Sequence, residues 1–424
     1  MDYSDSAAWT DFLETQAVLP EGFEIAVASL GFTPAEKPDA GVLPMRLSLI
    51  RTVEPTRSFA GVFTKNAFPG WPVVMGRELM SAPAIQGVLV NNKVANVGAA
   101  GGLEASRRLA DSVRKAMGDD APYVPSSTGV IGWALPVDEM EAALPELASS
   151  RLGDSVLPFA EAIMTTDAWP KVRSAPCGEG RIVGCAKGAG MVEPNMATML
   201  SFLLTDSAVP RDAARRILPK AVERSFNRIS VDGETSTSDT VILLSSGRRP
   251  YPGDEAFTEA LFETSSALAE DVVRNGEGCA HVFRVTVSGA PDERTAVALA
   301  RSVANAPLTK TAVRGNDPNI GRILQAVGAA CGRLGVEFPR DRAVLSIGGV
   351  EAYSAGEFRL DGAVEEEVSG YLRERELPLP APGWPVHEDR VEIDVRLDSG
   401  GASASVIGSD LSEEYVKINA DYRT

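Results

Sequence analysis

One segment, residues 187–204, constrains the fold more than any other part of the chain. Two glycines, a proline and an asparagine lie within residues 188–195, and a mostly apolar run follows over residues 199–204. Glycine adopts backbone conformations that other residues avoid, and proline fixes its own φ and pushes the preceding residue toward an extended shape. The pattern therefore predicts a tight bend that leads into a buried strand.

The bond between Ala197 and Thr198 lies just before this apolar run. A β-hydroxyl group at a strained turn can attack the carbonyl carbon that precedes it, and the resulting ester can then be cleaved. The new chain would begin with Thr198, whose free α-amine can act as the base for its own hydroxyl group. An ordinary turn between a loop and a strand is the alternative interpretation of the same residues.

Length and charge limit the classes of protein. With 424 residues, the chain is expected to form about two or three packed units, and an apolar fraction of 44% is ordinary for a soluble globular protein. The net charge of -17 argues against nucleic acid as a partner. Without a run of about 18 apolar residues no membrane partner is expected, and the acidic N-terminus lacks a signal-peptide pattern, so we predict a cytoplasmic protein.

The sequence is poor in residues for other catalytic centres. The four cysteines form no CxxC pair, and only two histidines, His281 and His387, are present, so a histidine-based triad is poorly supplied. No phosphate-binding loop and no GxGxxG after a strand occurs, so no cofactor is predicted. Asp232, Glu234 and Asp239 are a conceivable metal site, but a solvated turn is the favoured interpretation, and we predict no metal.

Hydrophobic periodicity predicts the main elements. Apolar residues repeat every four positions over residues 104–117, which indicates an amphipathic helix, and continuous apolar runs at 87–90 and 241–244 indicate buried strands. Residues 391–397 and 402–407 alternate around a Ser-Gly-Gly turn and predict a hairpin. A helix over 211–226 is expected to be kinked or divided at its proline, and residues 415–422 are expected to form a last strand. The predicted fold class is α/β, in the form of an α+β layered sandwich.

A second segment rich in hydroxyl groups and glycine covers residues 124–132. Thr128 and Gly129 lie at its centre, where backbone N–H groups and a hydroxyl can converge on one point. Such a group of donors would serve as an oxyanion hole, and a plain turn is the alternative.

Several motifs together resemble the ornithine acetyltransferase family, the bifunctional glutamate N-acetyltransferases. They occur in the family's order between about residue 50 and the end of the chain, at residues 126–132, 187–200, 225–228, 231–233, 235–237, 274–278, 310–312, 317–322 and 415–422. The resemblance implies a self-processing fold with an N-terminal threonine. It also implies cleavage between Ala197 and Thr198, which divides the chain into an α chain, residues 1–197, and a β chain, residues 198–424.

The resemblance further implies a role for each matched residue. Thr198 is the nucleophile, and Thr128 and Gly129 hold the oxyanion. The implied substrate-binding residues are Thr165, Thr166, Lys187, Glu277, Asn419 and Thr424. Lysine suits an α-carboxylate and glutamate suits an ammonium group, so these residue types fit amino-acid substrates.

The implied reaction is ping-pong acetyl transfer. Thr198 takes an acetyl group from N²-acetylornithine or a related N-acyl amino acid and passes it to glutamate. The implied partners are small amino-acid substrates and the two fragments of the precursor, two copies of each in a heterotetramer, and the implied pathway is arginine biosynthesis.

Some positions depart from the family pattern. Lys93 adds a charge to a loop that is usually neutral, and Ile320 and Ile407 stand where the family usually has tryptophan. These departures leave open a secondary-pathway acyltransferase that acts on a different amino acid. Two further alternatives are an amidase or aminopeptidase, in which water resolves the same acyl-Thr198 intermediate, and an uncleaved scaffold protein.

Overall fold

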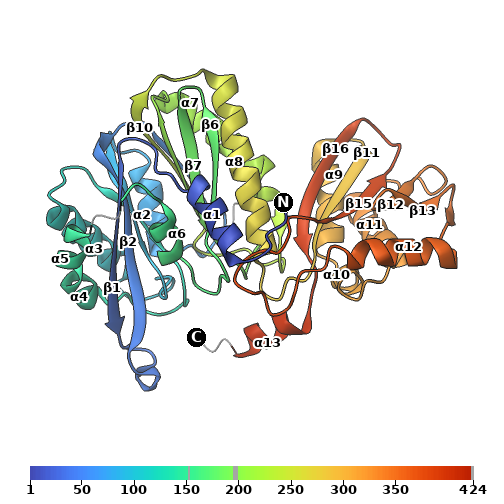
Figure 1. Ribbon diagram of the computed structural model, residues 1–424, viewed down its shortest axis with the longest axis horizontal. Coiled ribbons are helices and arrows are strands. Elements are labelled where there is room, and N and C mark those ends of the chain that lie inside the picture. The colour runs from blue at the N-terminus through green and yellow to red at the C-terminus, as the bar shows by residue number, and fades with distance from the viewer. Residues whose placement is uncertain (151–152, 194–198, 422–424) are drawn as a thin grey trace. The chain divides into compact units, whose positions relative to one another are not determined.

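The computed structural model describes residues 1–150, 153–193 and 199–421 and divides into two units (Figure 1). The first unit contains Thr10–Asn227 and Glu234–Val272, and the second contains Met1–Trp9, Arg228–Gly233 and the described residues from Val273 onward. Each unit has its own sheets and helices, so the predicted combination of α and β elements is confirmed.

A four-stranded sheet and its helices form one part of the first unit. Its strands, in spatial order, are β1 (Phe23–Phe32), β2 (Leu43–Thr56), β4 (Ile85–Asn91) and β5 (Tyr123–Ser127). The predicted amphipathic helix is α3 (Gly102–Met117), which connects the parallel strands β4 and β5 and buries Leu109 and Val113. Helices α4 (Val137–Ala142) and α5 (Leu144–Ser149) bury Met140 and Leu147 in the same core.

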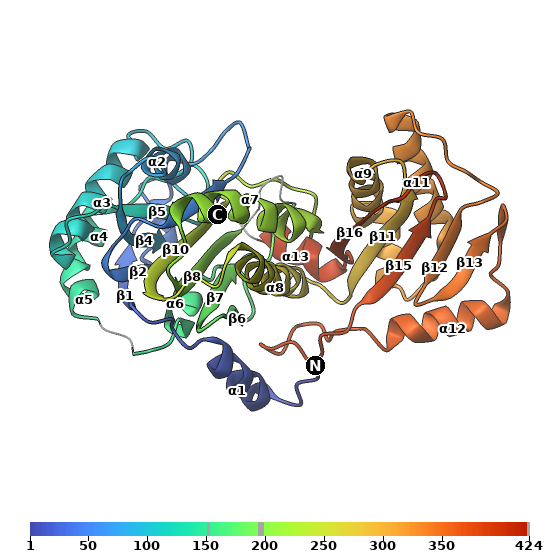
Figure 2. The ribbon, with the colours of Figure 1, turned by 90° about the horizontal axis from the view of Figure 1, so that it is seen from above.

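A five-stranded sheet forms the other part of the first unit. Its strands, in spatial order, are β3 (Phe59–Phe63), β10 (Thr240–Arg249), β8 (Leu200–Ser207), β7 (Gly180–Lys187) and β6 (Lys171–Cys177). All of β8 is buried, as its apolar run predicts, and its antiparallel pairing with β7 sets Lys187 opposite Leu200. Helix α8 (Asp254–Arg274) lies along this sheet (Figures 1 and 2), and a Cβ on Gly184 would meet Leu268 of α8 at 2.6 Å.

The second unit is built on a seven-stranded sheet. Its strands, in spatial order, are β14 (Glu357–Phe358), β13 (Val350–Ser354), β12 (Val344–Ile347), β15 (Val391–Arg396), β11 (Val282–Ala290), β16 (Ala402–Ser409) and β9 (Ile229–Ser230). Its helices are α9 (Glu293–Ala304), α10 (Pro307–Arg314), α11 (Ile320–Leu334), α12 (Gly362–Arg373) and α13 (Glu413–Asp421). One hydrophobic core joins α9, α11 and α12 to the sheet.

The remaining elements are four α-helices and two 3-10 turns of the described residues. They are α1 (Ser6–Gln16), α2 (Trp71–Leu79), α6 (Leu157–Ala162), α7 (Arg211–Arg224) and two 3-10 turns, Pro38–Ala40 and Phe226–Arg228. Within the described ranges, no helix is long and apolar enough to cross a membrane.

The structure corrects two of the predicted elements and excludes one alternative for a third. Strands β15 and β16 form no hairpin, because β11 inserts between them and pairs with both. Residues 413–421 form helix α13 rather than a strand, and the Ser412 hydroxyl accepts a hydrogen bond from Tyr415 N–H at its first turn, as a helix cap does. Pro219 does not divide helix α7, which continues from Arg211 to Arg224 with Leu218 and Val222 buried.

Candidate active site

The first group of site residues lies at the carboxyl ends of β4 and β5. The two strands pair in parallel with Asn91 opposite Ser127, so the loops that follow them begin side by side. Thr128 N–H donates to Asn91 O at 3.1 Å, and Val130 N–H donates to Lys93 O at 2.9 Å. These bonds fix the backbone on both sides of Gly129.

Gly129 is required by this geometry. Its φ of +127° lies in the region that favours glycine, and a Cβ would come within 2.1 Å of the Lys93 carbonyl carbon. Across the described part of the chain, Gly129 N–H has no hydrogen-bond acceptor. An unbonded backbone N–H beside the Thr128 hydroxyl is the type of donor pair that stabilises an oxyanion.

Lys187 connects this loop to the five-stranded sheet. Its ammonium nitrogen Nζ donates to Thr128 Oγ1 at 2.7 Å and to Thr165 Oγ1 at 3.1 Å. Because an ammonium group only donates hydrogen bonds, Thr128 Oγ1 must accept, and its own proton remains available for another group. No hydrogen bond of the Thr166 side chain occurs within the described ranges, so of the two threonines it is Thr165 that contacts Lys187.

Asp167 is a further residue of this site, close enough to Lys187 for their charges to interact. The sequence alone did not indicate it as a site residue. Its Oδ1 accepts from Gly188 N–H at 2.8 Å and from the fully buried Lys171 ammonium, and its Oδ2 accepts from Thr165 N–H at 3.0 Å. Burial alone would raise the pKa of Asp167, but the Lys171 and Lys187 ammonium groups and the Gly188 N–H outweigh burial and hold this pKa well below its usual range. Asp167 therefore carries a charge that joins the segments bearing Thr165 and Lys187.

The residues that flank the expected cleavage bond are attached to residues 234–239. Glu193 N–H donates to Glu234 O at 2.9 Å, and the Thr235 hydroxyl donates to Glu193 O at 3.1 Å. On the other side, Met199 N–H donates to Asp239 Oδ1 at 2.9 Å. Ala197 and Thr198 themselves lie outside the described residues.

Asp232, Glu234 and Asp239 differ in exposure: Glu234 is exposed and Asp232 is half-buried, as a solvated turn predicts. Asp239 is only 1% exposed, so a solvated turn does not describe it. Within the described ranges, no group of three or more His, Cys, Asp or Glu side chains is arranged to hold a metal ion.

Glu277 and Asn419 come together in the second unit. Asn419 Nδ2 donates to Glu277 Oε2 at 2.8 Å, although the two residues are far apart in the sequence. Gly278, next to Glu277, has a φ of +66°, and a Cβ there would lie 2.5 Å from both Ser412 Oγ and Tyr415 N. The Ser412 hydroxyl donates to Gly278 O at 2.6 Å and so holds the start of α13 against this loop. Thr424 lies outside the described residues.

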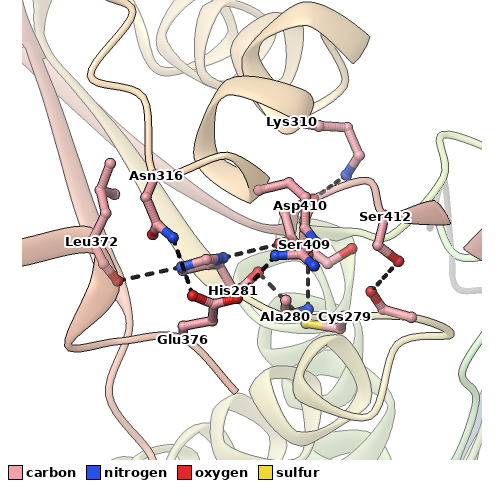
Figure 3. Close-up of polar contacts among 12 residues, drawn as sticks. Cys279, Ala280, His281, Lys310, Asn316, Leu372, Glu376, Ser409, Asp410 and Ser412 are labelled. Atoms are coloured by element: carbon pink, nitrogen blue, oxygen red, sulfur yellow. Dashed lines mark hydrogen bonds and ion pairs between the residues drawn. The ribbon is translucent and has the colours of Figure 1, made fainter. Parts of the chain in front are cut away.

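A buried Asp–His pair supports the same loop (Figure 3). Asp410 Oδ1 accepts from Ala280 N–H at 2.9 Å, and Asp410 Oδ2 lies 3.0 Å from His281 Nδ1. The other ring nitrogen, Nε2, lies 3.3 Å from Leu372 O, so both ring nitrogens face acceptors. Because both ring nitrogens already have partners within the protein, His281 serves a structural role rather than that of a catalytic base.

The cysteines supply no alternative nucleophile. All four are free and buried, and burial raises the pKa of the Cys185 and Cys279 thiols, which disfavours the reactive thiolate.

Lys93, which departs from the family pattern, lines a cavity of about 480 Å³ in the first unit. The other charged residues of this lining are Arg46 and Glu161, and Met164 and Asn92 also contribute. Two lining residues adjoin the candidate site: Met164 directly precedes Thr165 in the chain, and the backbone of Lys93 lies against Gly129. The lining carries both positive and negative charge.

The chain is similar in sequence to known proteins over most of its length. The model of the ArgJ family matches residues 38–424. A relative from Nitratidesulfovibrio vulgaris, named arginine biosynthesis bifunctional protein ArgJ, is 40% identical over 416 residues, which cover 96% of this chain and 99% of the relative. A relative of the same name from Thermus thermophilus is 36% identical over 409 residues, which cover 96% of this chain and 99% of the relative.

Solved structures include similar proteins as well. The ArgJ protein of Bacillus halodurans matches with 33% identity and a TM-score of 0.47 and covers 53% of this chain and 100% of its own. The ornithine acetyltransferase of Mycobacterium tuberculosis, solved with ornithine, matches with 28% identity and a TM-score of 0.36 and covers 44% of this chain and 97% of its own.

Proposed function

The chain belongs to the ArgJ family, and from this premise we propose that it is a self-cleaving acetyltransferase that moves the acetyl group of N²-acetylornithine to glutamate through an acyl-Thr198 intermediate. The observation that carries the proposal is the contact of Lys187 Nζ with Thr128 Oγ1, next to the unbonded N–H of Gly129. This contact makes the Thr128 hydroxyl a donor for a developing oxyanion.

The proposed maturation begins with attack of Thr198 Oγ on the Ala197 carbonyl carbon. The peptide C–N bond breaks, an ester forms, and the α-nitrogen of Thr198 gains a proton and becomes an amine. Water then hydrolyses the ester, which leaves a carboxylate on Ala197 and a free hydroxyl on Thr198. The products are the proposed α chain, residues 1–197, and β chain, residues 198–424, and we propose that two of each assemble.

Acetyl transfer would take place in two steps, in which Thr198 first receives the acetyl group and then gives it up. Thr198 Oγ attacks the acetyl carbonyl of the donor while the free α-amine takes the hydroxyl proton and passes it to the departing ornithine amine. The neutral amine of glutamate then attacks the acetyl ester, gives up a proton to the α-amine of Thr198, and leaves as N-acetylglutamate. The hydroxyl of Thr198 is restored, so no cofactor is consumed.

The remaining residues have proposed binding roles. Lys187 and Thr165 would bind the α-carboxylate of the substrate, and Glu277, held by Asn419, would bind a substrate ammonium group. Thr166 and Thr424 complete the proposed substrate-binding set. Buried free cysteines suit a reducing compartment, which supports our proposal of a cytoplasmic enzyme.

The proposal is tested by intact mass under denaturing conditions. The wild type is expected to give two fragments, 1–197 and 198–424, whereas Thr198→Ala should give one intact chain. Thr198→Ser, which keeps a β-hydroxyl group, is the matched control and should still be cleaved. One intact chain in both the wild type and Thr198→Ala would show that Thr198 does not gain the free amine that the proposed mechanism needs as a base. The scaffold alternative would then be favoured.

The substrate is tested by product analysis of the cleaved enzyme. Incubation with N²-acetylornithine and glutamate should give N-acetylglutamate and ornithine in equal amounts. Ornithine and acetate formed without glutamate, at the same rate, would indicate a hydrolase. Transfer to a different acceptor amine with a larger kcat/KM than to glutamate would indicate an acyltransferase of a secondary pathway.

A further inference from the structure

The cavity that Lys93 lines is not used by the proposed reaction. Its volume is about 480 Å³, and all of its lining residues belong to the first unit. Two cations, Lys93 and Arg46, and one carboxylate, Glu161, are the charged groups of the lining, and the rest is mostly apolar, with two prolines and two methionines. A hollow of this size with a few polar groups on an apolar wall is typical of sites that bind small molecules.

The Lys93 ammonium group is available to a ligand. Lys93 is half-buried, and within the described ranges its ammonium group has neither a hydrogen-bond acceptor nor an ion-pair partner. Glu161 lines the same cavity but forms no ion pair with Lys93 or with Arg46. The positive charge of Lys93 is therefore not neutralised by the part of the protein that the structure describes.

The backbone of Lys93 is held in an unusual conformation. Its φ of +75° lies in the left-handed region, which a residue with a Cβ adopts rarely and glycine adopts easily. Val130 N–H donates to Lys93 O at 2.9 Å, and Ala95 N–H donates to Val130 O at 2.9 Å, so the surrounding chain enforces this conformation. A charged side chain at a position that suits glycine indicates a function for that side chain.

Arg46 is held beside Lys93 by Asn92. Arg46 N–H donates to Asn92 Oδ1 at 2.7 Å, and Asn92 N–H donates to Arg46 O at 3.3 Å. One guanidinium nitrogen of Arg46 donates to Glu161 O at 3.0 Å, and no other acceptor for this guanidinium group occurs among the described residues. Asn92 thus joins two cations that both retain donors for a ligand.

The charges of the lining favour a carboxylate. Two cations and one carboxylate leave an excess of one positive charge in the cavity, although the whole chain has a net charge of -17. A carboxylate group balances this excess and can accept hydrogen bonds from both an ammonium and a guanidinium group. A doubly charged phosphate would exceed it and would also be repelled by Glu161.

We propose that this cavity is a carboxylate-binding subsite, in which Lys93 and Arg46 bind the side-chain carboxylate of the acceptor glutamate. The inference rests on the proposed function, which names glutamate as the acceptor. The binding roles proposed above account for the α-carboxylate and for an ammonium group of the substrates, but not for the second carboxylate of glutamate. Lys93 and Arg46 are thus specificity-determining residues, and neither contacts the reacting atoms.

The position of the cavity suits this role. Met164 lines it and directly precedes Thr165, one of the two residues proposed to bind the α-carboxylate. The subsite would also distinguish the two substrates, because the side chain of ornithine ends in an ammonium group, which Lys93 and Arg46 repel. The loop that bears Lys93 is usually neutral in the family, so the subsite is a feature of this chain.

The test measures both half-reactions of the cleaved enzyme. In a ping-pong reaction, kcat/KM for the donor reports on acetylation of the enzyme, and kcat/KM for the acceptor reports on transfer from it. In Lys93→Met, kcat/KM for glutamate is expected to fall at least about fivefold more than kcat/KM for N²-acetylornithine. The preference for glutamate over glutamine, which has the same length and no charge, should fall by a similar factor.

Two further variants complete the test. Lys93→Gly removes the charge and suits the positive φ, so it should fold and show the same loss of preference. Lys115→Met is the matched control, because it removes one positive charge from an exposed position on α3, outside the cavity. It should leave the preference for glutamate over glutamine unchanged.

Three kinetic results would overturn the inference. Equal falls in kcat/KM for donor and acceptor would show that Lys93 acts through the loop of Gly129 rather than through the cavity. An unchanged preference for glutamate in Lys93→Met and Lys93→Gly would exclude contact with its side-chain carboxylate. An equal loss of preference in Lys115→Met would reduce the effect to overall charge.

Calorimetric titration with glutarate separates failure of this inference from failure of the proposed function. Glutarate has two carboxylates and no amine, so its binding requires no reaction, and an enzyme that transfers no acetyl group to glutamate would refute only the proposed function. Binding to the wild type that weakens at least about fivefold in Lys93→Met supports the subsite. Equal affinities, no binding to the wild type, or tighter binding of inorganic phosphate than of glutarate would overturn it.

Discussion

Lys187 Nζ lies 2.7 Å from Thr128 Oγ1, so the last residue of β7 donates a hydrogen bond to the first residue after β5. The contact joins the five-stranded sheet to the four-stranded sheet within the first unit. It also determines the direction of the Thr128 hydroxyl proton, because the oxygen is already occupied as an acceptor. Lys187 therefore affects the oxyanion donor as well as any carboxylate that it binds.

Replacing Lys187 with methionine is expected to lower kcat/KM for acetyl transfer by tenfold or more, because hydrogen bonds of a charged group contribute about 1.5–3 kcal/mol. Methionine keeps much of the volume and loses the ammonium group. Lys187→Arg keeps the charge and should retain more activity than Lys187→Met. Steady-state kinetics with equal activity in the two variants would contradict a role for the charge.

Thr128→Val removes the hydroxyl group at nearly constant volume and is expected to lower kcat about a hundredfold, as the loss of one oxyanion donor does. Thr128→Ser keeps the donor and should stay within about tenfold of the wild type. Self-cleavage, followed by intact mass over time, is expected to slow in the same order. A Thr128→Val enzyme with wild-type kcat would refute the oxyanion assignment.

Gly129→Ala is expected to abolish activity and to lower the melting temperature, because its Cβ would meet the Lys93 carbonyl carbon at 2.1 Å. Gly132→Ala is the matched control, since Gly132 also has a positive φ, +91°, but has no atom within 4 Å of its Cβ position. The difference between the two variants measures the close approach of the loops rather than backbone strain alone. Similar melting temperatures would show that the Lys93 loop can move aside.

Asp167→Asn is expected to destabilise the fold at pH 7 by about 3 kcal/mol, because it leaves the buried Lys171 ammonium without its counter-ion. The pKa of Asp167 is held low in the folded state. Its stabilising effect is therefore fully present above the unfolded pKa of about 3.9 and is lost as the pH falls through the folded pKa. The difference in unfolding free energy between wild type and variant should thus be constant near neutral pH and shrink below about pH 4.

Urea unfolding across pH measures this difference. Asp111→Asn is the control. Asp111 and Lys115 form an ion pair with the same four-residue spacing as Asp167 and Lys171, but their side chains are exposed. This control variant should leave stability unchanged. A pH-independent gap between wild type and Asp167→Asn would contradict an ionised Asp167.

Asn419→Ala removes the hydrogen bond to Glu277 Oε2 and is expected to raise KM for the amino-acid substrate about two- to tenfold with little change in kcat. The reason is that Glu277 would be less well held for a substrate ammonium group. Lys417→Ala, on the same helix with an exposed ion pair to Glu414, should leave KM unchanged. A fall in kcat at constant KM would place Asn419 in the chemical step instead.

The sequence predicted a helix or strand correctly where the residues of that element by themselves show a hydrophobic pattern. The four-residue apolar repeat of α3 and the apolar runs of β4, β8 and β10 correspond to elements in the structure, because burial of these side chains requires only that some core be present. The hydroxyl-rich segment around Thr128 also had a local signal. Asp167 and Lys171 did not, since Asp and Lys side chains are usually solvated, and only the packing of the folded chain shows that both are buried.

The sequence by itself determined which segments are apolar, where glycine and proline interrupt them, and which residues can carry acyl-transfer chemistry. Only the tertiary structure decided which strands pair and which residues lie next to one another. The pair β15 and β16 has a hairpin pattern, yet β11, about a hundred residues earlier in the chain, lies between them and takes the hydrogen bonds of both. The same holds for Met199 and Asp239, and for Lys187 and Thr128. The local sequence does not indicate which hydrogen-bonding groups will pair with each other. The pairs are determined only when the whole chain folds and buries its apolar side chains.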